Sequence, residues 1–348
     1  MVPVVDLSRR GQRFASSFAA ASERIAASGS FLLGAELSAF ETEFADWLGA
    51  DHCVGVSSGA AALQLALASA GIGVGDEVLV PAFTAVPTAS AVAAIGAVPR
   101  PIDVDPATAC ITTDTVESGR TPRTKAVVVV HLYGYPCPLP ETDLLVIEDA
   151  AQAHGALVDP GRSAATAYSF YPTKNLGGIG DGGAVVTDDA DVAQRVRRLR
   201  VHGMTEQYVH EDVSQNFRMS EIEAAWLRLA LPELAGDVDR RRSIVAAYRR
   251  AAPSLQWQAD DPRHAYHLAV FRSPDRLSTR TALKARWVTT AIHYPLAITQ
   301  QPAYRDLEHA PCDASEAWAG QCISVPCFPE MTDAEIDQVC GVLAAVSG

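Results

Sequence analysis

A lysine and an aspartate, each following an expected β-strand, carry the most distinctive chemistry of this sequence. Asp149 comes directly after the apolar run Leu144 to Ile147 and its neighbour Glu148. This places it at the carboxyl end of a strand, where open α/β sheets bind their ligands, and an aspartate there can pair with a protonated heterocyclic nitrogen. Lys174 follows in the glycine-rich segment SFYPTKNLGGIGDGG. A lysine held partly desolvated has a lowered pKa and can form a Schiff base with an aldehyde or ketone.

These two residue types together are what pyridoxal 5′-phosphate (PLP) requires. Lys174 would form the Schiff base, and Asp149 would keep the pyridine ring protonated so that the ring can accept electrons. Outside this context Lys174 would be read as a surface lysine. Asp149 has a structural alternative, which is to cap a helix that begins at Ala150, and the two roles are compatible.

A cradle for a phosphate group precedes an expected helix. The turn Ser57-Ser58-Gly59-Ala60 leads into a helix beginning near Ala61. The N-terminus of a helix offers unpaired N–H groups and the positive end of the helix dipole. Ser169, on the strand that leads to Lys174, can add a hydroxyl. The glycines of GIGVGDE and GGIGDGG do not form a dinucleotide fingerprint, because the first group precedes a strand and the second does not open a helix.

Histidines and cysteines offer fewer candidates. With nine histidines in the chain, each is more often structural than catalytic, and we retain only His154 and His293 as candidates for substrate contacts. The seven cysteines form no CxxC pair and no His/Cys cluster with zinc-ligand spacing. We therefore expect no metal and no disulfide framework.

Strands alternating with helices are expected to position these residues. Two helices lie between Ala20 and Leu48, with a turn at Ser28 to Gly34, and an Ala/Leu-rich helix ends at Gly71. Another helix is expected around Ala89 to Ile95. Apolar runs indicate buried strands at CVGV, Glu77 to Val80, Ala126 to Val130, Leu144 to Ile147, Tyr168 to Phe170 and Ala184 to Thr187. This pattern predicts an α/β fold with a mainly parallel sheet covered on both faces.

A smaller α+β domain is expected after the sheet. Beyond Pro232 come a basic helix at Val238 to Arg250, strands at Ala265 to Phe271 and Thr289 to Tyr294, and a helix at Thr332 to Val346. Thr332 or Asp333 would cap this last helix. We divide the chain into a large cofactor-binding domain at 1–235 and a small C-terminal domain at 236–348.

Charge and hydropathy exclude several classes of partner. The 348 residues carry a formal net charge of −13, from 41 acidic and 28 basic side chains. Nucleic-acid binding requires a basic surface, so no nucleic-acid partner is expected. The N-terminus lacks the pattern of a signal peptide, and no apolar run approaches the ~20 residues that span a bilayer. We expect a cytoplasmic protein without a membrane partner.

Several long segments, in order along almost the whole chain, resemble the DegT/StrS family of fold-type-I PLP enzymes, most of which are sugar aminotransferases. The segments are SGSFLLGAELSAFE, GVSSGAAALQLAL, GDEVLVPAFT, TPRTKAVVVVHLYG, IEDAAQAHGA, SFYPTKNLGGIGDGGAVVT, NFRMSEIEAAWLRLALPEL and AIHYPLAITQQPAY. The resemblance implies a three-layer large domain with a smaller C-terminal domain.

The resemblance also implies roles for individual residues. Lys174 would be the Schiff-base lysine and proton shuttle, Asp149 the partner of the pyridine nitrogen, and Gln152 a donor to the ring hydroxyl oxygen. The phosphate would be held by Ser169, by the N–H groups of Gly59 and Ala60, and by Asn216 of a neighbouring subunit. A shared site of this kind makes the functional unit at least a homodimer.

The sequence departs from the family at several places near the site. Ala60 stands where the family usually has threonine, a loss of one donor worth roughly 1.5–3 kcal/mol unless Ser58 or water replaces it. Ala85 stands where an aromatic residue usually stacks on the cofactor, and Phe83 is a candidate replacement. The stretch HLYGYPCPLPETDLLVIEDAA lacks most of a helix, and DPGRSAATAYSFYP lacks the usual Gly-Ser-Phe-Gly segment.

An aminotransferase is the function that these observations favour. An amino acid, expected to be L-glutamate, would convert the cofactor to pyridoxamine phosphate, which then aminates a keto sugar, such as a nucleotide-linked deoxysugar, or a cyclitol, with ping-pong kinetics. Biosynthesis of specialised metabolites, including antibiotics, or of surface sugars is the expected setting. One alternative is a PLP-dependent dehydratase or eliminase, which Ala85 and the trimmed loops favour. Another is a non-catalytic PLP-binding regulator, which the retention of Lys174 and Asp149 disfavours.

Overall fold

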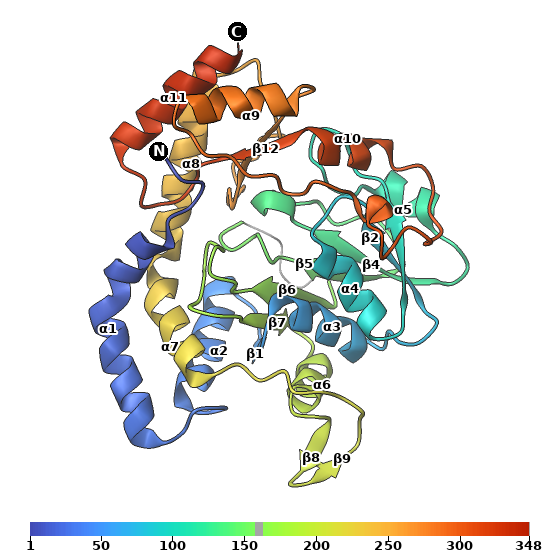
Figure 1. Cartoon of the computed structure of the whole chain (residues 1–348). Coiled ribbons are helices and arrows are strands. Elements are labelled where there is room, and N and C mark those ends of the chain that lie inside the picture. The colour runs from blue at the N-terminus through green and yellow to red at the C-terminus, as the bar shows by residue number, and fades with distance from the viewer. Residues whose placement is uncertain (157–162, 348) are drawn as a thin grey trace.

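A seven-stranded sheet forms the centre of the main body (Figure 1). The computed structural model describes residues 1–156 and 163–347. The strand order is β1-β7-β6-β5-β4-β2-β3, and only β7 runs antiparallel to its neighbours, which confirms the mainly parallel sheet. The strands are β1 His52–Val56, β2 Glu77–Pro81, β3 Val98–Ile102, β4 Thr124–Val130, β5 Leu145–Asp149, β6 Ala165–Ser169 and β7 Gly183–Thr187.

Helices cover both faces of this sheet, so the predicted α/β architecture is confirmed. Alternate residues of one strand enter different cores: on β1, Val54 and Val56 lie in one hydrophobic cluster and Cys53 in the other. This is the period-two alternation of a strand buried on both sides. The first cluster packs under α3 Gly59–Ser69, α4 Val86–Ala94, α5 Thr113–Gly119 and α6 Ala190–Leu199, and the second under α1 Leu7–Ser28, α2 Ala35–Leu48 and α7 Glu221–Ala230.

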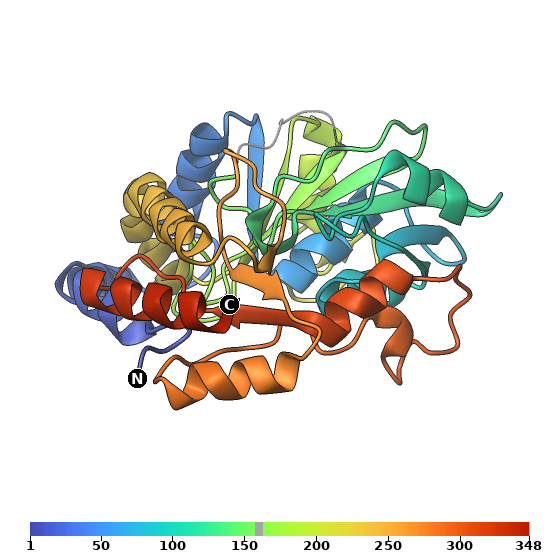
Figure 2. The same ribbon diagram turned by 90° about the horizontal axis from the view of Figure 1, so that it is seen from above.

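A third hydrophobic cluster belongs to the C-terminal part of the chain. It lies among a three-stranded antiparallel sheet and its helices, seen from above in Figure 2. Val2 is buried in the same cluster, so the N-terminus packs against the C-terminal part. The elements are α8 Leu234–Ala251, β10 Gln256–Trp257, β11 Ala269–Arg272, α9 Arg276–Ala285, α10 Asp313–Gln321, β12 Cys322–Val325 and α11 Asp333–Ser347.

Helix α8 contributes to two of the clusters: Leu234 and Val238 to the second, and Ile244 and Tyr248 to the third. We therefore propose the division into 1–235 and 236–348 with α8 as the shared element. A short hairpin of β8 Met204–Glu206 and β9 Val209–His210 projects from the main body (Figure 1).

Two helix boundaries predicted from the sequence are confirmed in detail. Helix α1 ends at Ser28 because Gly29 adopts the left-handed conformation, with φ 67°, before α2 begins at Ala35. Helix α11 starts with a reciprocal cap: Thr332 Oγ1 accepts from the Glu335 N–H at 3.2 Å, and Glu335 Oε2 accepts from the Thr332 N–H at 2.8 Å.

Three local predictions were wrong. Residues 289–294 form no strand, because Thr289 and Ala291 pair singly with Val2 and Ser324. The strand expected from residue 265 begins only at residue 269, since Tyr266 has φ 42°, which breaks an extended chain. The helix considered as an alternative after Asp149 does not form in the described residues 150–156, which contain turns instead.

The predicted trimming between two strands is visible: only one 3₁₀ turn, η1 Leu132–Gly134, lies between β4 and β5. The other shortened segment, DPGRSAATAYSFYP, falls partly outside the described residues. Among the residues that the structure describes, no helix combines the length and apolar character needed to cross a bilayer.

Candidate active site

The residues predicted to hold a cofactor converge on one cavity of about 90 Å³. It lies where the carboxyl ends of β4, β5 and β6 face the N-terminus of α3, as expected for a parallel sheet. Its lining comes from segments far apart in the chain and includes Gly59, Ala60, Ala85, Asp149, Gln152, Ser169 and Lys174.

Asp149 ends β5 and is only 6% exposed. Its Oδ2 accepts from Thr88 Oγ1 at 2.8 Å, and its Oδ1 accepts from the Ala151 N–H at 3.1 Å. Burial raises the pKa of this carboxyl, while its two hydrogen bonds and the charge of Lys174 act in the opposite direction. A cation or a protonated ring nitrogen placed against Asp149 would favour the ionised form, so the residue suits the predicted pairing. Thr88, on α4, was not found from the sequence.

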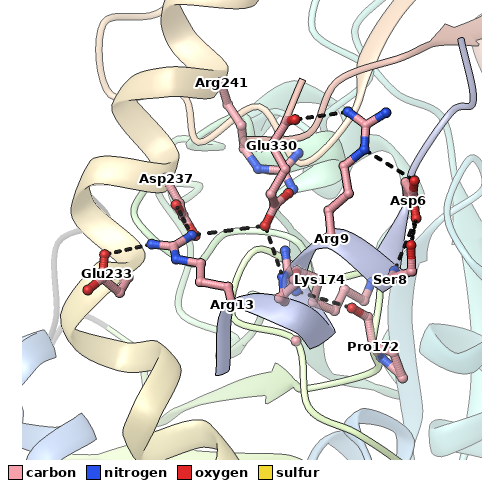
Figure 3. Close-up of polar contacts among 12 residues, drawn as sticks. Asp6, Ser8, Arg9, Arg13, Pro172, Lys174, Glu233, Asp237, Arg241 and Glu330 are labelled. Carbon is pink, nitrogen blue, oxygen red and sulfur yellow. Dashed lines mark hydrogen bonds and ion pairs between the residues drawn. The ribbon is translucent and has the colours of Figure 1, made fainter. Parts of the chain in front are cut away.

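Lys174 lines the same cavity as Asp149, and its amine has a lowered pKa. Burial lowers its pKa to about 8, and the charge of Asp149 opposes that shift. Within the described part of the chain, no hydrogen bond or ion pair holds its Nζ atom. The main chain is held instead: buried Arg10 of α1 donates from Nη1 to the carbonyls of Lys174 at 3.0 Å and Pro172 at 3.2 Å. Figure 3 draws the network of α1 side chains around this segment.

Gln152 is oriented by hydrogen bonds at both ends of its amide. Its Oε1 accepts from the Tyr133 N–H at 2.6 Å, and its Nε2 donates to the Tyr294 hydroxyl at 2.9 Å. Because the main chain fixes the oxygen, the NH₂ group is the end left to serve a ligand, and one of its two N–H bonds is still free for that purpose. This orientation suits the predicted donor role.

The predicted phosphate cradle depends on a close approach of α3 to β6. A Cβ on Gly59 would lie 2.5 Å from the Ser169 Cβ, so only glycine fits there. Ser58 caps α3, its Oγ accepting from the Ala61 N–H at 3.1 Å. Within the described residues, no hydrogen bond occupies the N–H groups of Gly59 and Ala60. These free donors at a helix N-terminus fit an anion such as the cofactor phosphate.

Asn216 lies apart from the Lys174 cavities. In this chain its Oδ1 accepts from Arg218 Nε at 2.9 Å. With Ser57, Ser58 and Ala60 it lines a separate hollow on the outer side of the same turn. Its predicted contribution to the site of a second subunit therefore stays a prediction.

The two candidate histidines occupy different environments. His293 lines a second cavity beside Lys174, and burial lowers its pKa to about 4. His154 is fully buried, with its ring 5.3 Å from Tyr168 and 5.7 Å from Phe170 between centroids, and it lines neither cavity. The structure therefore places His293, and not His154, in the lining of a cavity that Lys174 shares.

Phe83 cannot replace the aromatic residue missing at position 85. It is fully buried and stacks on Trp318 at 5.9 Å with an interplanar angle of 22°. Ala85 itself lines the cavity, so its small side chain faces the space where a cofactor ring would lie. The prediction that Phe83 takes over the stacking role of an aromatic residue at position 85 is wrong, because the Phe83 ring lies in the core of the first cluster.

The second cavity, of about 240 Å³, also contains residues that the sequence did not single out. Arg241 and His267 line it together with Lys174, His293 and Tyr294. Arg241 belongs to the run Arg240-Arg241-Arg242, which reads as a solvated helical face. No group of His, Cys, Asp and Glu suited to a metal occurs in the described chain.

A desolvated lysine lines the same cavity as a buried aspartate, at the strand ends of a parallel sheet and facing a helix N-terminus, and this arrangement is suited to Schiff-base chemistry in an enzyme of the α/β class. Comparison with known proteins gives the family. The chain belongs to the DegT/DnrJ/EryC1/StrS aminotransferase family, whose model matches residues 13–344. It is an aminotransferase, and the resemblance found in its motifs is confirmed.

Individual relatives cover nearly the whole chain. The dTDP-3-amino-3,4,6-trideoxy-alpha-D-glucose transaminase of Streptomyces venezuelae is 40% identical over 95% of this chain and 92% of its own length. The crystal structure of S. venezuelae DesV in complex with a ketimine intermediate has a TM-score of 0.93 at 38% identity, covering 99% of this chain and 98% of DesV. NtdA from Bacillus subtilis, solved with bound cofactor PMP, has a TM-score of 0.91 at 28% identity and covers 99% and 85%.

Proposed function

We propose that this chain is a PLP-dependent aminotransferase that moves the amino group of L-glutamate onto a keto sugar, such as a nucleotide-linked deoxysugar, or onto a cyclitol. The observation that carries the proposal is the single cavity shared by Lys174, Asp149 and the free N–H groups at the start of α3. The relatives named for dTDP-sugar transamination support the acceptor class. We further propose a cytoplasmic homodimer acting in specialised-metabolite or surface-sugar biosynthesis.

Different site residues would bind different parts of PLP. Gly59 and Ala60 would hold the phosphate through their N–H groups, with Ser169 as a hydroxyl donor beside them. Asp149 would pair with the ring nitrogen, and Gln152 would donate from Nε2 to the ring hydroxyl oxygen. PLP supplies an aldehyde that reacts with amines and a ring that withdraws electrons from the carbon attached to the nitrogen.

The protein then contributes proton transfer and orientation. Lys174 Nζ, with its lowered pKa, would be the group that takes up and holds the proton of the substrate carbon. Thr88 and the Ala151 N–H fix the Asp149 carboxylate, so that its charge does not need to reorganise during the reaction. We propose Asn216 as an additional phosphate ligand from the second subunit and His293 as a substrate contact.

An absorption experiment tests this function. PLP is added to the purified protein and to Lys174→Ala, and spectra are recorded before and after excess L-glutamate. The wild type is expected to show a Schiff-base band that L-glutamate converts to the pyridoxamine form, and the variant should lack the band. A Lys174-dependent band that no amino donor changes would favour a dehydratase, an eliminase or a regulator, and no Lys174-dependent band would refute the cofactor assignment.

A further inference from the structure

Arg241 is a buried cation beside the reactive lysine without a partner of opposite charge. It is 1% exposed and lines the cavity that Lys174 and His267 share. Its Nη1 donates to the carbonyls of Tyr266 at 3.4 Å, of His267 at 3.3 Å and of Cys327. Its Nε has no hydrogen-bond partner, and within the described residues Arg241 forms no ion pair. In Figure 3 no dashed line joins Arg241 to a carboxylate.

The neighbours of Arg241 in the sequence are paired in the ordinary way. Arg240 forms an ion pair with Asp333 at 2.6 Å, and Arg242 forms one with Asp239 at 3.0 Å. Both of these arginines are more exposed than Arg241. The contrast matters because a buried charge without a counter-charge is costly, whereas a surface charge is not.

The surroundings add positive charge to this end of the cavity. Lys174 lines it. Buried Arg10 lies nearby: its pKa is lowered first by burial and second by the positive charge of Arg241. Glu330 pairs with Arg10 at 3.8 Å and Arg13 at 4.0 Å instead. None of the described residues that line the cavity is an aspartate or a glutamate, and His267 Nδ1 is a second buried polar atom without a partner. The cavity is therefore suited to a small anion.

The chemistry of the proposed function indicates which anion this is. The α-carboxylate of an amino donor is bonded to the same carbon whose proton Lys174 moves. It must therefore lie close to the Lys174 amine, in a cavity that Lys174 and the carboxylate-binding group both line. A carboxylate offers two oxygens, which match the planar fork of a guanidinium.

We propose that Arg241 binds the α-carboxylate of the amino donor, with His267 as a second donor. This inference rests on the proposed aminotransferase function and names the residue that selects an amino acid over a simple amine. The three main-chain carbonyls that Arg241 Nη1 already bonds hold the side chain in place before the donor arrives, which reduces the entropic cost of binding.

Three amino donors separate the possible roles of Arg241. L-Glutamate has both carboxylates, L-glutamine lacks the side-chain carboxylate, and L-isoglutamine carries an amide in place of the α-carboxylate. The PLP-loaded enzyme is mixed with each donor, and the loss of the Schiff-base band is followed in a single turnover. In the wild type, L-isoglutamine should react about 10- to 100-fold less efficiently than the other two, the loss expected for a charged hydrogen bond.

Arg241→Met is the matching variant. It should lower the efficiency with L-glutamate and L-glutamine about 10- to 100-fold and leave L-isoglutamine unchanged. Arg242→Met is the control, because Arg242 also donates to main-chain carbonyls, those of Gly155, Arg263 and His264, but does not line the cavity. It should keep the wild-type preference.

The outcomes distinguish this inference from the proposed function. Equal reactivity of L-isoglutamine in the wild type would overturn the inference even if Arg241→Met did not fold. An equal loss with all three donors would mean that Arg241 is only structural, and a loss confined to L-glutamate and L-isoglutamine would assign it to the side-chain carboxylate. A wild type that forms the Lys174 band but reacts with none of the donors would refute the aminotransferase proposal itself.

Discussion

The lowered pKa of Lys174 predicts how the rate of PLP capture depends on pH. Burial lowers this pKa to about 8. Roughly a tenth of the amine is then neutral at pH 7, against about 0.04% for an exposed lysine with a pKa near 10.4. Capture of PLP by the apo-protein should therefore rise about 10-fold between pH 7 and pH 9, with a midpoint near 8. Stopped-flow absorbance of the Schiff-base band at a series of pH values measures this midpoint.

Asp149→Asn tests the direction in which the Asp149 charge shifts the pKa of Lys174. The carboxylate raises the pKa of Lys174, so removing its charge should move the midpoint to lower pH. A midpoint near that of an exposed lysine would refute the burial argument. A midpoint that moves upward in Asp149→Asn would show that the carboxylate does not act on the amine as the structure indicates.

The lowered pKa of Lys174 also affects the stability of the apo-protein. The unfolded chain binds a proton on Lys174 up to about pH 10.4, whereas the folded chain releases it above about 8. Because the unfolded state binds more protons in this window, the free energy of unfolding should rise with pH between these values, by up to roughly 3 kcal/mol. Lys174→Met should remove this rise, which denaturant titrations at pH 8 and pH 10 would detect.

Three further variants test other parts of the site. Thr88→Val removes the hydroxyl that donates to Asp149 and should weaken PLP binding about 5-fold, a loss near 1 kcal/mol. Equilibrium titration of the Schiff-base band measures this affinity. An unchanged affinity would mean that the hydroxyl does not position the carboxylate. Mixing inactive Asn216→Ala and Lys174→Ala subunits should restore about a quarter of the wild-type activity if the asparagine serves the neighbouring site, and no recovery would refute that role. His154→Phe should leave turnover unchanged and preserve or raise the melting temperature, since both ring nitrogens of this buried histidine lack partners. A loss of turnover would instead support His154 as a substrate contact.

The sequence was sufficient to predict the residues whose position depends on a single strand end. Asp149 and Lys174 each follow an apolar strand, and parallel strands deliver their carboxyl ends to one edge, so the two meet without further information. The helix N-terminus at Gly59 follows the same logic, because a strand precedes it directly.

Residues that reach the site from other layers could not be found in this way. Thr88 is an unremarkable threonine in an Ala-rich helix, and Arg241 lies in a run of three arginines that predicts a solvated face. The middle arginine is buried where its Nη1 donates to main-chain carbonyls of Tyr266, His267 and Cys327, which come from segments distant in the sequence. His154 shows the opposite error, because a polar residue close to the site in sequence turns inward to aromatic rings of the second core.

Three ionisable groups of the described chain that form no ion pair share a single explanation. Lys174 has no hydrogen bond on Nζ in the described chain, Arg241 has no counter-charge there, and Asp149 is buried with its pKa raised. Each arrangement lowers the stability of the ligand-free fold, and no packing requirement of the sheet or helices demands any of them. An aldehyde would satisfy Lys174, a carboxylate would satisfy Arg241, and a protonated ring nitrogen would satisfy Asp149. Ligands that bind only the folded state stabilise it. PLP and its amino donor would therefore bind more favourably because they relieve the cost of these three groups in the apo-protein.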